Sequence, residues 1–212
     1  MSKTRTADTQ KTRIQSQNEA LILDAALEVF STFGYRGSTI DQIASRCKMS
    51  KPNLLYYFKR KEDIYRAVLE RTLALWLAPL EALDPEGDPI EELTRYISSK
   101  LDLTFERPEA SRLFANEVLH GAPHVGDFLK GPLRQLVEAK SAIILQWCNE
   151  GKINPVSPVH FIFAIWSVTQ HYADFSVQVE AVLDDKLAVG SNRDVTRNAI
   201  FEILLRGLKP VP

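Results

Sequence analysis

Residues Thr39 to Phe58 read TIDQIASRCKMSKPNLLYYF, and this stretch decides the fold. The apolar residues of its first part recur at helical spacing, at Ile40, Ile43 and Ala44. Ser38 stands just before this pattern, and Asp41 follows Ser38 at the spacing of a capping box. The pattern therefore predicts a short helix that Ser38 caps and that buries one side.

A second short helix is expected after a break of three residues, Cys47 to Met49. Ser50 is its candidate N-cap, and Pro52 falls in the first turn, where N–H groups lack partners within the helix. Its buried side is expected to hold Leu54, Leu55 and Phe58. Two short helices joined by a three-residue turn are typical of a helix-turn-helix, whose second helix enters the DNA major groove. The same spacing also fits an ordinary helical corner.

Polar residues cluster where such a second helix would meet DNA. The helix N-terminus at Ser50 favours an anion, so a phosphate group can lie against it. Lys51 and Asn53 are placed to reach base edges, while Tyr56 and Tyr57 suit phosphate oxygens. The ring of Tyr57 also fits a partly buried position. The expected DNA contacts are Thr39, Lys48, Ser50, Lys51, Pro52, Asn53, Tyr56, Tyr57 and Lys61.

Charge is distributed unevenly along the chain, although the net charge is only −1. Residues 1–61 carry 11 Lys and Arg against 5 Asp and Glu, whereas the remaining residues are acidic overall. A basic end on an acidic body indicates a nucleic-acid contact at that end. Residues 1–15 are polar and basic, so we expect a disordered arm in which Lys11 and Arg13 either contact DNA or stay solvated.

The run from Ala20 to Phe58 resembles the DNA-binding domain of the TetR family of transcriptional regulators. The residues GYRGST, from Gly34 to Thr39, match the turn between the first two helices of that family. The residues LYYF, from Leu55 to Phe58, and the following Lys61 and Glu62 match its recognition helix and the start of its fourth helix. One position departs from the family pattern, because Lys48 stands in the turn where glycine is usual. A left-handed backbone at Lys48 would cost about 1–2 kcal/mol, which a phosphate contact of the lysine could offset.

The rest of the chain predicts an all-α protein. Amphipathic patterns cover 16–33, which Gly34 ends, and then 64–83, 90–106, 108–119, 125–150, 158–173 and 195–208. We expect a disordered basic arm at 1–15, a three-helix helix-turn-helix DNA-binding domain at 16–62, and a helical ligand-binding and dimerisation domain at 63–212. The helix from Ile64 is shared by both domains, which makes it a candidate lever between them.

One stretch of the second domain is apolar enough to need cover on most sides. Residues 153–173 hold no Asp, Glu, Lys or Arg, but their Asn, Pro, Ser, His and Gln residues exclude a membrane span. A second copy of the chain would supply the cover, and residues 195–208 add another apolar helix. We expect a homodimer in which these last two long helices of each subunit form an isologous four-helix interface.

Candidates for a ligand site are aromatic and amide side chains of the second domain. Trp166 and Gln170 are four residues apart on one helix face, where an indole and an amide suit a planar ring with an imide or amide edge. Trp76, Phe114 and Asp174 are further candidates. Packing in a core or an interface also explains these aromatic residues.

A second resemblance extends into this domain. The segments TLALWLAPLEAL, ASRLFANEVLHGAP and IFAIWSVTQHYADFSVQVEAV resemble the pyrimidine-utilisation repressors, a TetR subgroup that responds to uracil and thymine. The resemblance implies that Trp76, Trp166 and Gln170 line the pocket, with Phe114 and Asp174 beside them. We therefore expect a cytoplasmic repressor, without a cofactor or a membrane partner, that a small planar ligand such as uracil or thymine releases from double-stranded operator DNA.

Two alternatives remain open. A TetR-like regulator can respond to a different ligand or to a protein partner, and some relatives activate transcription or bind DNA only with ligand. A helical enzyme is the other class, for which the four histidines are the candidate residues. No catalytic motif accompanies them, and the two cysteines, Cys47 and Cys148, lack the spacing of metal ligands.

Overall fold

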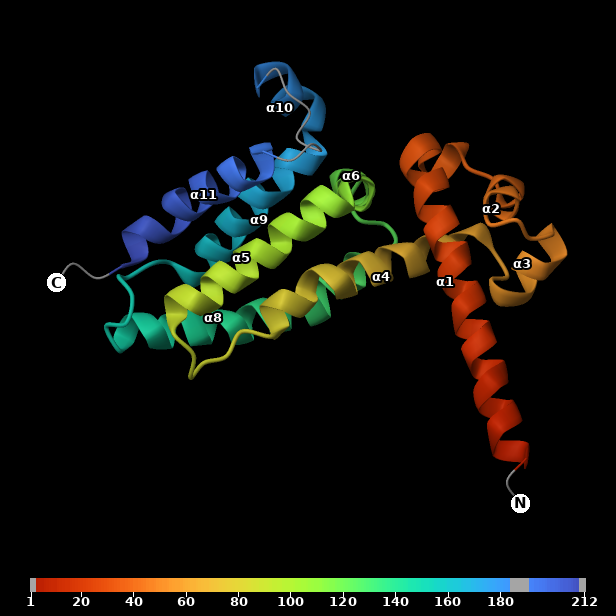
Figure 1. The fold of residues 1–212 in the computed structure, drawn as a ribbon, viewed down its shortest axis with the longest axis horizontal. Coiled ribbons are helices and arrows are strands. Elements are labelled where there is room, and N and C mark those ends of the chain that lie inside the picture. The colour runs from red at the N-terminus through yellow and green to blue at the C-terminus, as the bar shows by residue number, and fades with distance from the viewer. Residues whose placement is uncertain (1–2, 184–190, 210–212) are drawn as a thin grey trace. The chain divides into compact units, whose positions relative to one another are not determined.

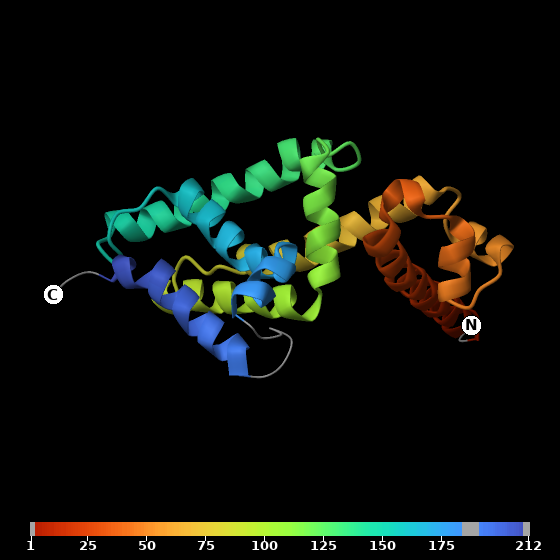
Figure 2. The same cartoon turned by 90° about the horizontal axis from the view of Figure 1, so that it is seen from above.

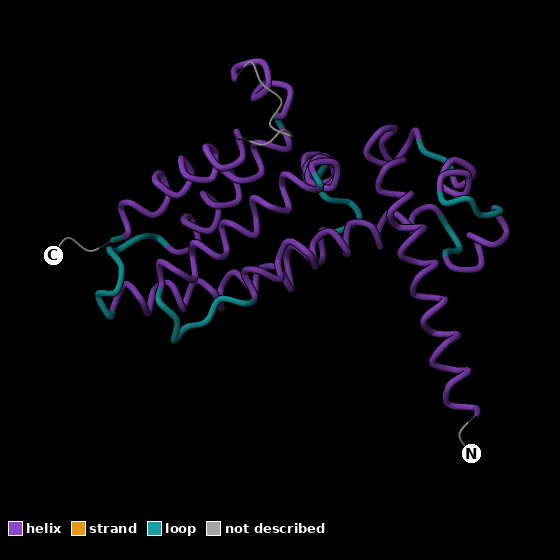
Figure 3. The backbone as a smooth tube through the Cα atoms, in the orientation of Figure 1, coloured by secondary structure: helices purple, strands orange, loops and turns teal. Residues whose placement is uncertain are grey.

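The structure, a computed structural model, describes residues 3–183 and 191–209, with the side chains of 13–183 and 193–209. All regular structure within those ranges is helical, as the sequence predicts (Figure 3). The chain forms two compact units that divide between Thr72 and Leu73. We predicted a boundary after residue 62, at the start of the helix that begins at Lys61, whereas the structure has it inside that helix.

The N-terminal unit consists of three helices and the first part of a fourth (Figure 1). Their bounds are α1 Lys3–Gly37, α2 Ile40–Arg46, α3 Lys51–Tyr57 and α4 Lys61–Glu81. The backbone of α1 leaves helical geometry at Gly34, whose φ of 68° favours glycine, so the main helix ends where the sequence predicts it. α2 contacts α1 and α3 contacts α2, which is the predicted helix-turn-helix arrangement.

The start of α1 differs from its predicted start at Ser16. Residues 3–15, expected to form a disordered arm, continue the helix toward the N-terminus. They contain no glycine or proline, and extending an existing helix costs far less free energy than nucleating a new one. The side chain of Arg13 is exposed, and that of Lys11 lies outside the described residues.

The cap of α2 is shifted by one residue from its predicted position. Thr39 is the N-cap: its side chain accepts a hydrogen bond from the N–H of Gln42, and the side chain of Gln42 accepts one from the N–H of Thr39. Ser38 is buried, and its hydroxyl donates to the carbonyl of Gly34 at 2.6 Å. Because the hydroxyl of Ser38 is used by a carbonyl near the end of α1, the next residue, Thr39, caps α2.

One apolar core fills the N-terminal unit. It includes Ile22, Ala25, Ala26, Val29, Phe30, Ile43, Ala44, Leu54, Ile64, Tyr65, Val68 and Leu69. Leu21 and Phe33 share the helical period of α1, yet each is about half exposed. Leu21 lies at the edge of the apolar stripe, and Phe33 lies at the end of the helix beside Gly34, so neither is covered like the central positions.

The C-terminal unit holds the second part of α4 and the helices that follow it. Their bounds are α5 Pro89–Glu106, α6 Pro108–Leu119, α7 Gly126–Phe128, a π-helical turn Leu129–Leu133, α8 Arg134–Asn149, α9 Pro158–Asp174, α10 Ser176–Leu183, α11 Ser191–Leu205 and a 3-10 turn Arg206–Leu208. α5, α6 and α9 agree with the sequence patterns to within a residue. The pattern at 125–150 divides instead, because Gly131 and Pro132 interrupt regular α-helix there.

α9 is the central helix of this unit, because it packs against α5, α6 and α8, and α11 packs against α5. Figure 2 shows α6 running between the layer of α5 and that of α8. The largest fully buried side chain is Trp147 of α8, whose indole N–H donates to the carbonyl of Pro85 at 3.0 Å. In the part of the chain that the structure describes, no helix is long and apolar enough to span a membrane.

Candidate DNA-binding and effector sites

The turn between α2 and α3 closes on a lysine in the left-handed region. Lys48 has a φ of 56°, and its N–H donates to the carbonyl of Ser45 at 3.2 Å. The N–H of Met49 donates to the carbonyl of Ala44 at 2.9 Å. These two bonds form a Schellman motif, in which the left-handed position normally belongs to glycine. The lysine therefore carries the backbone cost that the departure from the family pattern predicts.

α3 buries one side and presents its polar residues on the other. Ser50 is the predicted N-cap, and its hydroxyl oxygen accepts from the N–H of Asn53 at 3.4 Å. Leu54 is fully buried against the core. The exposed residues of this segment are Ser50, Lys51, Pro52, Asn53 and Tyr56. The side of α3 away from the core is thus the one that the DNA contacts were predicted to occupy.

Two of the predicted DNA contacts on α3 have side-chain partners on other helices of the N-terminal unit. The Lys51 ammonium lies 2.8 Å from a carboxylate oxygen of Asp41, in an exposed ion pair of the kind that contributes little stability. A phosphate group can displace such a carboxylate at small cost. The hydroxyl of Tyr57 accepts from the side-chain amide of Asn18 at 2.7 Å, while Tyr56 is 65% exposed. Tyr57 therefore joins α3 to α1, and Tyr56 is available to a ligand.

Lys61 joins the end of α1 to the start of α4. Its ammonium donates to the carbonyls of Tyr35 at 2.7 Å and Ser38 at 2.8 Å, and lies 4.5 Å from the centre of the Tyr35 ring. Two of its three N–H groups are therefore used inside the protein. A phosphate contact by Lys61, which the sequence predicts, would have to use the third.

Two of the aromatic candidates, Trp76 and Phe114, contact each other. Trp76 is buried and meets the ring of Phe114 edge to face, with 5.7 Å between ring centres. The ammonium of Lys100, on α5, lies 4.6 Å from the centre of the Trp76 indole ring. A cation over an indole face is attracted by the electrons of the ring, which holds the lysine in place.

Trp166 is joined to α5 by its indole nitrogen. The N–H of Trp166 donates to the hydroxyl of Tyr96 at 2.7 Å. Tyr96 is almost fully buried, and this burial raises the pKa of its hydroxyl even though the bond from Trp166 acts in the opposite direction. The single polar group of Trp166 is therefore satisfied inside the protein, and its ring remains as an apolar surface.

Asp174 ends α9 in a partly buried position beside α6. One of its carboxylate oxygens accepts from the hydroxyl of Ser111 at 2.5 Å. Burial raises the pKa of Asp174, while the bond from Ser111 and the nearby charge of Lys100 lower it. Burial lowers the pKa of Lys100 to about 8, and the charge of Asp174 opposes that shift.

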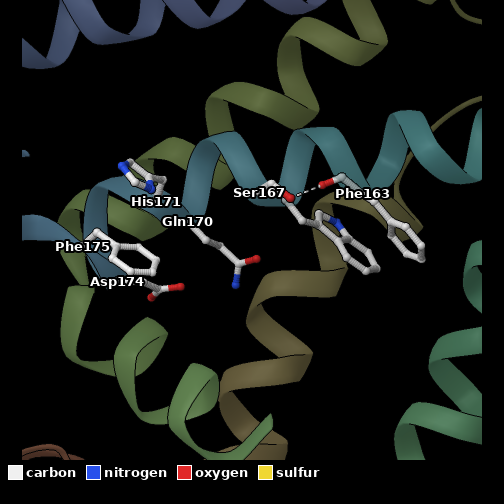
Figure 4. A pocket seen from close by; sticks show the side chains of 7 residues that line it. Phe163, Ser167, Gln170, His171, Asp174 and Phe175 are labelled. Carbon is white, nitrogen blue, oxygen red and sulfur yellow. Dashed lines mark hydrogen bonds between the residues drawn. The ribbon is translucent and has the colours of Figure 1, made fainter. Parts of the chain in front are cut away.

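A pocket of about 640 Å³ lies along α9 (Figure 4). It is lined by Phe163, Trp166, Ser167, Gln170, His171, Asp174 and Phe175. In Figure 4 the side chains of Gln170 and Asp174 leave α9 on one side and that of His171 on the other. Three of the five predicted effector contacts thus share this pocket, and Trp76 and Phe114 are not among its lining residues. Trp76 contacts Phe114 of α6 and Lys100 of α5 instead.

Comparison with known proteins decides the family. Residues 22–68 match the family described as bacterial regulatory proteins, tetR family, and residues 69–211 match the one described as YcdC-like protein, C-terminal region. Over 200 residues the chain is 44% identical to the HTH-type transcriptional regulator RutR of Escherichia coli K12, with 94% of each protein covered. The chain belongs to the TetR family.

Solved structures of TetR-like proteins share this fold. A TetR-like transcriptional regulator from Rhodococcus sp. RHA1 superposes with a TM-score of 0.65 at 20% identity, covering 90% of this chain and 94% of that one. AibR in complex with isovaleryl coenzyme A and operator DNA gives a TM-score of 0.69 at 17% identity, covering 90% and 99%. At such low identities the likeness concerns the fold alone.

Membership of the TetR family confirms that this chain is a DNA-binding transcriptional regulator and not an enzyme. TetR regulators bind operator DNA, dimerise and bind small-molecule effectors, which agrees with the partners expected from the sequence. The individual DNA and effector contacts stay predictions.

We call the contacts of Trp166 with Tyr96, Trp76 with Lys100 and Asp174 with Ser111 the effector network. The sequence did not single out three of its residues, Tyr96, Lys100 and Ser111. Only Lys100 left a signal in the sequence. It stands on the apolar side of α5, between Ile97 and Leu101, where a charged residue is unexpected. Tyr96 and Ser111 are ordinary members of amphipathic helices, and only the fold shows what they contact.

Proposed function

We propose that the chain is a dimeric repressor whose operator binding is released by a small planar pyrimidine, uracil or thymine. The observation that carries the proposal is the 44% identity to RutR, which extends over the C-terminal unit as well as the DNA-binding unit. The resemblance of segments in the C-terminal unit to the repressors that respond to uracil and thymine also supports the proposal. A TetR regulator of a different ligand, or of a protein partner, is the alternative.

The chemistry of the C-terminal unit suits a pyrimidine-dione. Such a ring is planar and alternates N–H and carbonyl groups around its edge. The indole rings of Trp76 and Trp166 supply flat apolar surfaces, and the indole N–H of Trp166 is already bonded to Tyr96. The half-buried amide of Gln170 can donate and accept at once, so it can pair with an imide edge.

Dimerisation is proposed to use α9 and α11, as the sequence predicted. Both helices carry apolar side chains that are exposed in the single chain, among them Phe163 at 46% and Ile203 at 70%. Exposed apolar patches on a soluble protein mark interaction surfaces, and a second copy placed by a twofold axis would cover them. Phe163→Glu is expected to give a monomer in sedimentation velocity. The Leu145 side chain on α8 is exposed to a similar extent, at 49%, and Leu145→Glu is expected to stay dimeric.

The proposed mechanism is a shift between two spacings of the DNA-binding units. A twofold dimer places two copies of α3 in successive major grooves, about 34–36 Å apart. An effector that binds better to a dimer with another spacing moves the population away from DNA. The coupling is expected to be about 1–3 kcal/mol, and it must be the same in both directions.

Tryptophan fluorescence tests the effector directly. Purified protein is titrated with uracil and thymine, with cytosine and an unrelated planar heterocycle as controls, because stacking on Trp76 or Trp166 should quench emission. Gln170→Leu is expected to weaken uracil binding about tenfold through the lost hydrogen bonds. Gln146→Leu is the matched control, since Gln146 is exposed on α8. Absence of saturable quenching by either pyrimidine would remove the pyrimidine assignment and leave the TetR regulator.

A further inference from the structure

Lys100 is a buried cation for which the described residues provide no acceptor. Its side chain belongs to the apolar side of α5 and the residue is only 4% exposed. Its ammonium faces the indole of Trp76, and no hydrogen bond or ion pair of that ammonium occurs among the described residues. The ammonium nitrogen is not one of the fully buried side-chain atoms without a partner, so it borders accessible space. Burial of the rest of the side chain costs hydration that the indole face offsets only in part. Groups held at a cost to stability are common at functional sites.

Two neighbouring donors already have acceptors. The indole N–H of Trp166 goes to Tyr96, and the hydroxyl of Ser111 goes to Asp174. The Lys100 ammonium is the charged donor beside them, and it has no acceptor among the described residues. The charge of Asp174 raises the pKa of Lys100, although the two groups form no ion pair within 4 Å. A molecule between the two could accept from the ammonium and donate to the free carboxylate oxygen.

The elements around Lys100 match the shape of a planar ring. The indole of Trp76 lies against the ammonium, and the ring of Phe114 in turn meets the indole edge to face. Tyr96 stands one turn before Lys100 on α5 and bonds to Trp166, which places a second indole on the same network. A ring carbonyl beside flat apolar surfaces is the acceptor that this arrangement fits.

We infer that Lys100 is the specificity-determining residue of the effector site and that it donates a charge-assisted hydrogen bond to a ring carbonyl oxygen of the effector. This inference rests on the proposed function, since it names the group of the pyrimidine-dione that the protein reads. The ammonium is expected to bind a ring with an oxo group at the position it faces more tightly than a ring with a weaker acceptor there. A thiocarbonyl is such a weaker acceptor, and it changes the ring very little.

The experiment measures binding of uracil, 2-thiouracil and 4-thiouracil to the wild type, Lys100→Met and Lys140→Met. Methionine keeps the length of the lysine stem and removes the charge. Lys140 is the matched control, because its ammonium donates to the backbone carbonyls of Glu81 and Leu83 in the same unit and has no part in the effector network. Melting temperature is recorded for each variant without ligand.

The wild type is expected to bind uracil about 10- to 100-fold more tightly than Lys100→Met does, which is the range of a charge-assisted hydrogen bond. It should also discriminate against one of the two thiouracils, and Lys100→Met should lose that discrimination. The melting temperature of Lys100→Met should equal or exceed that of the wild type, because an unpaired buried charge is gone. Lys140→Met should bind all three ligands as the wild type does.

Three results overturn the inference. If Lys100→Met binds uracil as tightly as the wild type, with the same ratios among the three ligands, Lys100 is a core residue and the proposed function stands. If Lys100→Met loses binding together with a fall in melting temperature, the role of Lys100 is structural. If the wild type binds no uracil here and no thymine in the fluorescence titration, the proposed function fails, and the assignment of Lys100 fails with it.

Discussion

Replacing Lys48 with glycine should stabilise the N-terminal unit. Lys48 holds a φ of 56° in the turn between α2 and α3, and its side chain is exposed. A non-glycine residue pays about 1–2 kcal/mol for a left-handed backbone. Glycine in turn gives the unfolded chain more freedom, which offsets about 0.5–1 kcal/mol of that gain. The net expectation for Lys48→Gly is a rise of about 0.5–1 kcal/mol in the free energy of unfolding.

Lys48→Ala is the matched control, because it removes the same charge but keeps the strained backbone. Native-state hydrogen exchange of the amides in α2 and α3 suits the comparison, since it reports local stability without requiring the whole chain to unfold in one step. Lys48→Gly should slow exchange relative to both the wild type and Lys48→Ala. Equal exchange in the two variants would refute the account of strain at Lys48.

The same pair of variants separates stability from DNA contact. If Lys48 binds a phosphate, both substitutions should weaken binding to an operator selected in vitro, and both should reduce the slope of log affinity against log salt by about one. The loss should be uniform across operator sequences, because a phosphate contact carries no base information. An unchanged salt slope would limit Lys48 to a role in the turn.

Further expectations concern buried polar contacts. Lys61→Met should lower the free energy of unfolding by about 1–3 kcal/mol, because two backbone carbonyls at the end of α1 lose their donor; urea unfolding followed by circular dichroism measures this. Tyr96→Phe should cost about 1–2 kcal/mol and alter tryptophan emission, because the N–H of Trp166 loses its acceptor. The pKa of Lys100, about 8 in the folded chain, lies below its ordinary value of 10.5, so the unfolded chain binds more protons between those values. The contribution of Lys100 to stability should therefore rise with pH from about 8 to 10.5, and Lys100→Met should lack that rise in a comparison of unfolding at several pH values. The charge of Asp174 on α9 opposes the shift of the Lys100 pKa, and burial raises the pKa of Asp174 itself.

Local patterns predicted the DNA-binding unit well, because its elements depend on residues close in sequence. The break at Cys47 to Met49 and the cap at Ser50 lie within a few residues of the helices that they delimit. The cap of α2 was wrong by one residue, since a pattern of side-chain types does not reveal that Ser38 faces inward. The early start of α1 was missed because a polar composition is shared by disordered arms and by exposed helices.

The effector network was less predictable, because it joins residues that are far apart in sequence. Trp166 meets Tyr96 across 70 residues, and Asp174 meets Ser111 across 63. No periodicity records such pairs, so the sequence identified the α9 residues by type and by resemblance and missed their partners. Lys100 differs from these partners, because a charged residue on the apolar side of α5 can be recognised from the sequence once the helix is predicted.

Release of the operator by uracil can be measured as reciprocal coupling between the two ligands. Operator affinity is measured with and without saturating uracil, and uracil affinity is measured with and without saturating operator. We expect uracil to weaken operator binding by about 5- to 150-fold, and operator to weaken uracil binding by the same factor. An operator affinity that saturating uracil leaves unchanged would contradict it.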